Sequence, residues 1–129
     1  MFTVEQINAA HAKVKSGAEF PAYIQEIKAL GVTHYETYVV DGHIDYHGPH
    51  GHSAKVPAKY PPLPIADLPA AASFKAALTA HQQGQTDFLT FIRDCAGFGI
   101  DRWKISMDKM TCTYFDKTGK EVLTENIPQ

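Results

Sequence analysis

The chain has little of several features that would identify a class of protein at once. Its 129 residues include two cysteines and one tryptophan, and the formal net charge is only −2. Cys95 and Cys112 form no CxxC pair, which predicts free thiols and a reducing compartment rather than a disulfide framework. So small a net charge gives no electrostatic reason to expect a nucleic acid or an anionic membrane as a partner.

Membrane spans, targeting signals and the common cofactor motifs are missing as well. No apolar run approaches the ~20 residues that a membrane span needs. The first residues have no basic flank and carry an acid at Glu5, which is not typical of a signal peptide, so we expect a cytoplasmic protein. No GxGxxG, GxxxxGK(S/T), GxSxG or EF-hand pattern is present. This argues against dinucleotide, nucleoside triphosphate, α/β-hydrolase and EF-hand calcium functions.

What the chain does contain is a repeat of its own sequence. Residues 19–51 align without a gap on residues 87–119, at an offset of 68. Large apolar residues, aromatic residues and glycines fall on their counterparts: Phe20 on Phe88, Tyr23 on Phe91, Ile24 on Ile92, Gly31 on Gly99, Val32 on Ile100, Tyr35 on Trp103, Tyr46 on Tyr114 and Gly51 on Gly119. This alignment predicts an internal duplication.

The first copy reads as two helices followed by a hairpin. Thr3 and Gln6 form a capping-box pattern, and Ser16-Gly17 breaks the helix that follows. Pro21 suits the first turn of a second helix that Gly31 ends. From residue 32 the pattern changes to a period of two, which predicts strands over 32–40 and 43–47. Asp41-Gly42 between them is typical of a two-residue type I′ turn.

The second copy repeats this plan. A helix containing Phe74 and Leu78 is followed by one that Thr86-Asp87 opens and Gly99 ends. Strands are expected over 100–108 and 111–115, with a last strand over 121–125.

The predicted fold class is therefore α+β, with two tandem helix-helix-strand-strand repeats that form one antiparallel sheet with helices on one face. We expect a single domain over 1–129, composed of repeat one (3–52), a proline-rich connector (53–69) and repeat two (70–128). Two separate subdomains are less favoured, because each would hold roughly 60 residues and be only marginally stable. The connector contains five of the eight prolines and is interpreted as a strap packed on its own protein; docking to a proline-binding module is the alternative.

The repeat also predicts which side chains share a face of the sheet. The apolar positions Tyr35, Thr37, Val39, Trp103, Ile105 and Met107 are assigned to the core, together with Ile44, Tyr46, Cys112 and Tyr114. The opposite face then carries His34, Glu36 and Tyr38, followed on the return strand by His43, Asp45 and His47. A two-residue turn would place Glu36 opposite His47 and leave His34 diagonal to it. Pairing of the two inner strands would make Glu36 and Lys104 neighbours.

His34, Glu36 and His47 form the first candidate site, with His43, Asp45, His50 and His52 as further candidates. Two imidazoles and a carboxylate on one sheet face are a ligand set for zinc or another divalent metal. A carboxylate beside a histidine also suits general acid–base catalysis. The alternative is a solvated or dimer-contacting face with scattered histidines, and no cofactor is required by the sequence.

The second candidate site is the turn that contains His81, Gln82, Gln85 and Asp87. These polar side chains surround a glycine and the start of a helix, and helix N-termini can hold anions. The alternative is purely local, with the glutamines and Gly84 forming the turn, His81 at the edge of the core and Thr86 as a cap.

Several segments resemble one known family. They are residues 31–36 (GVTHYE) with Asp41-Gly42, residues 81–88 (HQQGQTDF), Trp103, residues 110–114 (MTCTY) and residues 125–128 (ENIP). Together they resemble the YdfO-like family (DUF1398) of uncharacterised bacterial proteins, often labelled phage envelope proteins, over nearly the whole chain. The resemblance implies a small α+β domain of bacterial or prophage origin and no established reaction, cofactor or catalytic residue. Nothing in the sequence supports the envelope label.

We therefore expect a soluble, non-enzymatic binding or interaction module. Its aromatic-rich strands and its terminal strand favour a homodimer through a sheet face or edge. The alternative is a small metal-dependent or histidine-based enzyme with its site on the outer face of the first hairpin.

Overall fold

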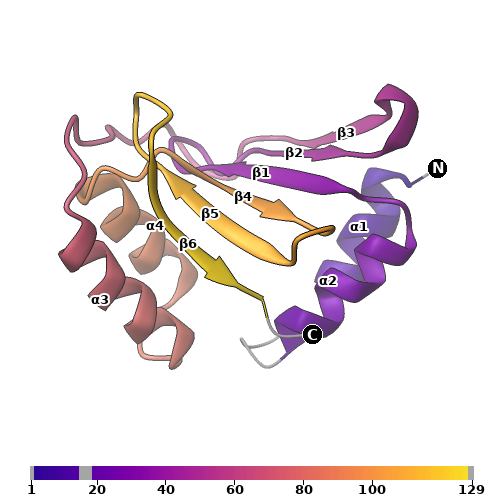
Figure 1. Ribbon diagram of the computed structural model, residues 1–129, viewed down its shortest axis with the longest axis horizontal. Coiled ribbons are helices and arrows are strands. Elements are labelled where there is room, and N and C mark those ends of the chain that lie inside the picture. The colour runs from indigo at the N-terminus through magenta and orange to yellow at the C-terminus, as the bar shows by residue number, and fades with distance from the viewer. Residues whose placement is uncertain (1, 15–18, 128–129) are drawn as a thin grey trace.

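A computed structural model describes residues 2–14 and 19–127 of the chain and places them in two layers (Figure 1). One layer is an antiparallel sheet of six strands, and the other consists of four α-helices among the described residues. The predicted helix break at Ser16-Gly17 and the last predicted residue of repeat two, Pro128, lie outside the described residues.

The first helix begins, and the second begins and ends, where the sequence predicts, whereas the first helix ends at His11, ahead of the predicted break. Thr3 caps α1 (Val4–His11): its backbone N–H donates to Gln6 Oε1 at 2.9 Å, and the Gln6 N–H donates to Thr3 Oγ1 at 3.2 Å. This reciprocal capping box satisfies two backbone donors that the helix itself leaves free. Pro21 lies in the first turn of α2 (Phe20–Ala29), and Gly31 follows that helix with a φ of 109°.

The second pair of helices covers the other end of the sheet. α3 (Ala71–Gln82) buries Phe74 and Leu78, and α4 (Phe88–Gly97) buries four side chains of its apolar face. Asp87 caps α4 by accepting a hydrogen bond from the Thr90 N–H at 2.7 Å. Phe88 lies three and four residues ahead of the buried Phe91 and Ile92 and so shares their face, yet it is 42% exposed because it lies at the first position of the helix, beyond the core.

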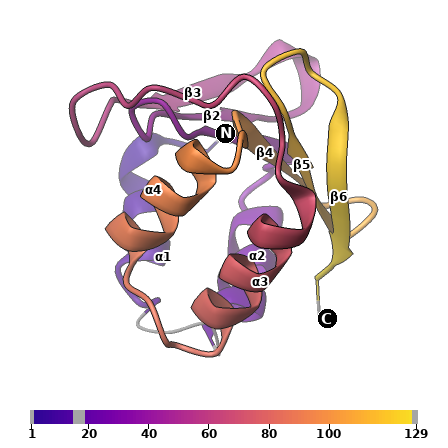
Figure 2. The ribbon, with the colours of Figure 1, turned by 90° about the vertical axis from the view of Figure 1, so that its left-hand side faces the viewer.

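The sheet joins the two halves of the chain at its centre. Its strands are β1 (His34–Tyr38), β2 (Ile44–His47), β3 (Ser53–Val56), β4 (Arg102–Ser106), β5 (Thr111–Phe115) and β6 (Glu121–Asn126). They lie in the order β3-β2-β1-β4-β5-β6, and every neighbouring pair is antiparallel. All four helices lie on one side of the sheet, α1 and α2 toward one end and α3 and α4 toward the other (Figures 1 and 2). The predicted α+β class is confirmed, whereas the internal duplication stays a prediction.

The assignment of 53–56 to the connector is wrong, because these residues form the edge strand β3. Ser53 and Val56 are the register partners of His47 and Ile44 on β2. Ala54 and Val56 are half-buried while Ser53 and Lys55 are exposed, so the segment has the alternation of a strand with one buried face. The prolines that begin at Pro57 hide this short signal in the sequence.

The predicted faces are confirmed, but the predicted register of the first hairpin is wrong by two residues. His34 lies opposite His47, and Glu36 lies opposite Asp45. The connection is longer than the two residues of a type I′ turn: the Tyr38 N–H donates to the His43 carbonyl at 3.0 Å, which leaves a four-residue loop over 39–42. A shift of two changes the partner of each side chain and keeps its face, since side chains alternate with a period of two.

The connector explains the longer loop, because it binds the loop's backbone. The Lys59 N–H donates to the Asp41 carbonyl at 2.8 Å, and the Leu63 N–H donates to the Val40 carbonyl at 2.7 Å. The Tyr60 hydroxyl donates to the Val39 carbonyl at 2.6 Å. Further along, the Ala66 N–H donates to the Ala96 carbonyl at 2.9 Å at the end of α4. Residues 57–70, here called the strap, therefore fasten the hairpin loop to the second helix pair, as the strap interpretation predicts.

Gly99 shows how closely the strap passes α4, and Gly84 provides a matched control. Both have a left-handed φ, 79° and 76°, which costs any other L-residue about 1–2 kcal/mol. A Cβ on Gly99 would lie 2.5 Å from the Leu68 carbonyl oxygen, whereas a Cβ on Gly84 would meet nothing within 4 Å.

We therefore predict that Gly84→Ala lowers the free energy of unfolding by about 1–2 kcal/mol and that Gly99→Ala lowers it by more than about 3 kcal/mol. Urea unfolding followed by circular dichroism measures both. Equal losses for the two variants would contradict the close approach of the strap to Gly99.

Candidate functional site

The outward-facing side chains of β2, β1 and β4 form a polar surface that no helix covers. This surface, here called the outer patch, consists of Asp45 and His47 on β2, His34, Glu36 and Tyr38 on β1, and Arg102 and Lys104 on β4. Each of these residues is half-buried against its neighbours. The strands thus hold the side chains in a packed layer rather than leaving them free in solvent.

Two histidines lie side by side in the outer patch. The rings of His34 and His47 stack with their centroids 4.6 Å apart and their planes within 11° of parallel. The Thr33 hydroxyl lies 3.1 Å from His34 Nδ1. In stacked rings the nitrogen lone pairs lie in parallel planes and do not converge on a single point between them, so this arrangement is poorly suited to a shared metal ion.

Glu36 is engaged by an arginine. Arg102 Nε donates to Glu36 Oε2 at 3.2 Å, and Arg102 Nη1 donates to Asp101 Oδ2 at 3.1 Å. The guanidinium carbon also lies 5.0 Å from the centroid of the Phe115 ring, in reach of a cation–π contact. Lys104 is the register partner of Glu36, as the sequence predicts, yet the ion pair forms with the diagonal Arg102.

The predicted metal ligands are thus close in the fold but oriented toward other partners. The structure brings His34 and His47 together and directs the Glu36 carboxylate to Arg102. Over residues 2–14 and 19–127, no group of three or more His, Cys, Asp or Glu side chains is arranged to hold a metal ion. Of the further candidates, His43 Nδ1 pairs with the Asp41 carboxylate and His52 Nε2 lies 2.8 Å from the Phe2 carbonyl oxygen.

Asp45 is the least satisfied member of the outer patch. Its Oδ1 is enclosed and has no hydrogen-bond partner among the described residues. Its register partners are Glu36 on one side and Lys55 on the other. Like charges directly opposite each other in a sheet are unfavourable, so the Asp45–Glu36 pair depends on nearby cations for compensation.

The electrostatics of the patch act on His34. Burial lowers the pKa of His34 below its usual 6.5, and the neighbouring His47 and Lys104 lower it further, while Glu36 and Asp108 act in the opposite direction. Since the folded state disfavours the protonated ring, the free energy of unfolding falls as the pH drops from 6.5 toward the folded pKa of His34.

The second predicted site is engaged in local structure. The His81 ring stacks on Phe91 at 4.4 Å, and its Nδ1 lies 3.1 Å from the Thr86 carbonyl oxygen. Gln82 Nε2 donates to Glu125 Oε1 at 3.0 Å on the neighbouring β6, and the Asp87 carboxylate caps α4. These contacts agree with the local alternative for His81, whereas the cap is Asp87 rather than Thr86 and Gln82 bonds to a strand distant in the sequence rather than within the turn.

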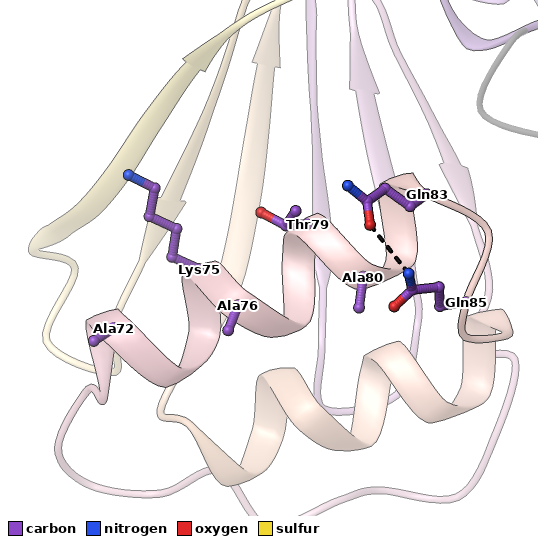
Figure 3. Close-up of a pocket in the computed structure, with 7 residues that line it drawn as sticks. All are labelled: Ala72, Lys75, Ala76, Thr79, Ala80, Gln83 and Gln85. Atoms are coloured by element: carbon purple, nitrogen blue, oxygen red, sulfur yellow. Dashed lines mark hydrogen bonds between the residues drawn. The ribbon is translucent and has the colours of Figure 1, made fainter.

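A shallow hollow lies beside this turn, along α3 (Figure 3). Of the four residues predicted for the turn, Gln85 is the one that lines the hollow, and its Nε2 donates to Gln83 Oε1 at 3.1 Å. The rest of the lining is mostly small: Ala72, Lys75, Ala76, Thr79 and Ala80. Among the residues that the structure describes, no polar side chain of a second helix or strand lines the hollow, so no ligand partner is added to the predicted turn.

A third feature was missed from the sequence, an apolar groove between the strap and α4. It is lined by Tyr60, Pro61, Pro62, Leu63, Leu89, Ile92 and Arg93. The available signal was the run Phe88-Leu89 ahead of Phe91-Ile92. At 3.6 residues per turn these four apolar side chains span about 160° of the helix circumference, wider than the roughly 100° stripe of a surface helix, so part of the stripe extends beyond the core.

The fold and the outer patch define a small α+β protein with an uncovered polar sheet face. The family model described as "Protein of unknown function (DUF1398)" matches residues 8–126, so the chain belongs to this family and the resemblance seen in its sequence is confirmed. No curated protein matches the chain. Among the described residues, no helix is long and apolar enough to cross a membrane.

The charges around His34 predict that two substitutions shift the pKa of this residue in opposite directions. We expect His47→Phe to raise the pKa of His34, because it keeps a ring for stacking and removes a neighbouring imidazole. We expect Glu36→Gln to lower the pKa of His34 further, because it removes a favourable negative charge. Nuclear magnetic resonance titration of the His34 ring protons measures both, with His52→Phe as the control. Shifts of the same sign in the two variants would show that other charges govern this ring.

Proposed function

We propose that this protein is an interaction module and that its outer patch binds a second copy of the chain. The observation that carries the proposal is the one-sided placement of the helices, which leaves a packed layer of charged and aromatic side chains uncovered on the other face. A surface whose side chains already hold one another in place loses less conformational entropy on binding than a mobile one.

The distribution of charge supports a twofold arrangement. Cations lie on β4, at Arg102 and Lys104, while Glu36 and Asp45 lie on the neighbouring β1 and β2. A twofold axis along the strands, above the boundary of β1 and β4, would place β4 of each copy over β1 of the other. Lys104 of each copy would then face Glu36 of its partner, the reciprocal contact that an isologous interface requires.

The sheet edges are less suited to pairing than the face. β3 has four residues and an exposed Lys55, and β6 carries the exposed Glu121 next to a register irregularity. Short, charged or irregular edge strands resist edge-to-edge association. Of the two predicted modes, the face therefore has the stronger support.

The two cysteines are consistent with the proposed reducing, cytoplasmic setting. Cys95 and Cys112 are free and buried. Burial raises the pKa of Cys112 to about 12 and raises that of Cys95 as well, so neither thiol is an activated nucleophile. The bacterial or prophage origin and the cytoplasmic location stay predictions.

We predict that size-exclusion chromatography with light scattering gives twice the 14.2 kDa chain mass at high protein concentration. Dissociation should increase with salt, because salt screens the attraction between the opposite charges of the two separate copies. Lys104→Gln should weaken the dimer by roughly tenfold, about 1.4 kcal/mol, while Lys28→Gln on the exposed side of α2 should not change it. A monomer at every concentration, or a dimer that neither salt nor Lys104→Gln affects, would exclude the proposed interface.

A second candidate function is a metal-dependent or histidine-based enzyme that acts from the outer patch. The proximity of His34 and His47 favours it. It requires near-stoichiometric zinc on untagged protein and loss of that zinc in His47→Ala, both measurable by metal analysis. Protein without bound zinc, or zinc that His47→Ala leaves in place, rules out the metal-dependent form.

A further inference from the structure

The groove between the strap and α4 lies on the helical side of the sheet, so it is separate from the outer patch. Leu89, in the first turn of α4, lines the groove and is 51% exposed. The other exposed large hydrophobic side chains of the described residues, Phe88 at 42% and Leu68 at 81%, do not line it. An exposed apolar surface at a groove is a common mark of a binding site.

Helix spacing explains why these side chains share the groove. Leu89, Ile92 and Arg93 lie at i, i+3 and i+4 of α4 and therefore occupy one side of it. Ile92 is fully buried and forms the floor, while Leu89 lies beyond the reach of the core. The apolar side chain of Leu89 is thus left without a partner at the mouth of the groove.

The strap forms the opposite wall, and it is rigid. Pro61 and Pro62 fix two consecutive φ angles, and the backbone on either side is held by the Tyr60 hydroxyl bond to Val39 and the Leu63 N–H bond to Val40. A preformed wall of this kind adds little ordering cost when a ligand binds.

Unpaired cations flank this apolar lining. Arg93 lines the groove from the helix side, and Lys59 precedes Tyr60 on the strap, with its Nζ 5.9 Å from the Phe88 ring centroid. Neither forms an ion pair with an acidic side chain of the described residues. Asp87 interacts electrostatically with Arg93, but its carboxylate is used as the helix cap, where it accepts a hydrogen bond from the Thr90 N–H.

We infer that this groove binds an apolar peptide segment of a partner protein that carries carboxylates beside its apolar anchor. The anchor covers Leu89 and the proline wall, and the carboxylates meet Lys59 and Arg93. A purely apolar segment would leave both cations unpaired, and a basic segment would bring like charges together, so neither matches the groove. The inference does not depend on self-association through the outer patch, because the two surfaces use different residues.

A random peptide library displayed on phage provides the probe. Phage that bind the Leu89→Gln variant are first removed from the library. The remaining phage are then selected for binding to the unmodified full-length protein. We expect the enriched sequences to combine large apolar residues with Asp or Glu. A synthetic peptide of the most enriched sequence should then bind at least roughly tenfold more weakly to Leu89→Gln and to Arg93→Gln, as fluorescence anisotropy measures.

Two matched controls separate the groove from other surfaces. Leu68→Gln removes a leucine outside the groove that is even more exposed than Leu89, and Lys104→Gln changes the outer patch. Both should bind the peptide as the unmodified protein does, and circular dichroism should show that all four variants are folded.

Three results of the peptide experiment would overturn the inference. They are the absence of enriched sequences, enrichment of basic sequences, and equal binding by Leu89→Gln and Leu68→Gln. Loss of self-association in Leu89→Gln, measured by light scattering, would also overturn it, because the groove would then be occupied by a second copy of the chain.

Discussion

The pairing of β1 with β4 is the contact on which the rest of the structure depends. These strands come from opposite halves of the chain, and their five register partners place Glu36 beside Lys104 and Thr37 beside Trp103. Because this pairing makes one sheet of two three-stranded units, all four described helices can cover the same face and share one core (Figure 1). A half of the chain alone would expose the inner edge of its sheet and would bury too little apolar surface for stability.

The strap connects the two halves of the chain and determines where the apolar groove and the uncovered sheet face lie. It connects the halves on the helical side by bonding to the loop of the first hairpin and to the C-terminal end of α4. By lying there it creates the apolar groove beside α4 and leaves the opposite face of the sheet uncovered. The course of the strap on the helical side of the sheet thus accounts for both the apolar groove and the exposed outer patch.

Much of the fold could be predicted because its signals are local and repeated. The capping box at Thr3, the glycines after α2, α3 and α4, and the alternation around Tyr35 and Trp103 each specify their element directly. The hairpin register failed because Asp41-Gly42 is a strong local turn signal, while the loop is determined by backbone bonds from Lys59 and Leu63, about twenty residues later. For the candidate site, the sequence predicted which side chains share a face of the sheet but not how they contact one another. The stacking of His34 on His47 and the ion pair of Glu36 with Arg102, rather than with Lys104, depend on that register and on side-chain rotamers.

Native-state hydrogen exchange tests the central role of the β1–β4 pairing most directly. The Val39 N–H, bonded to the Asp101 carbonyl at 2.9 Å, and the Met107 N–H, bonded to the Thr33 carbonyl at 3.0 Å, flank the two ends of this ladder. If the two halves form one cooperative unit, both amides open with the free energy of global unfolding measured by denaturant. Exchange of these two amides at a much lower free energy, with the outer hairpins still protected, would contradict a shared central pairing.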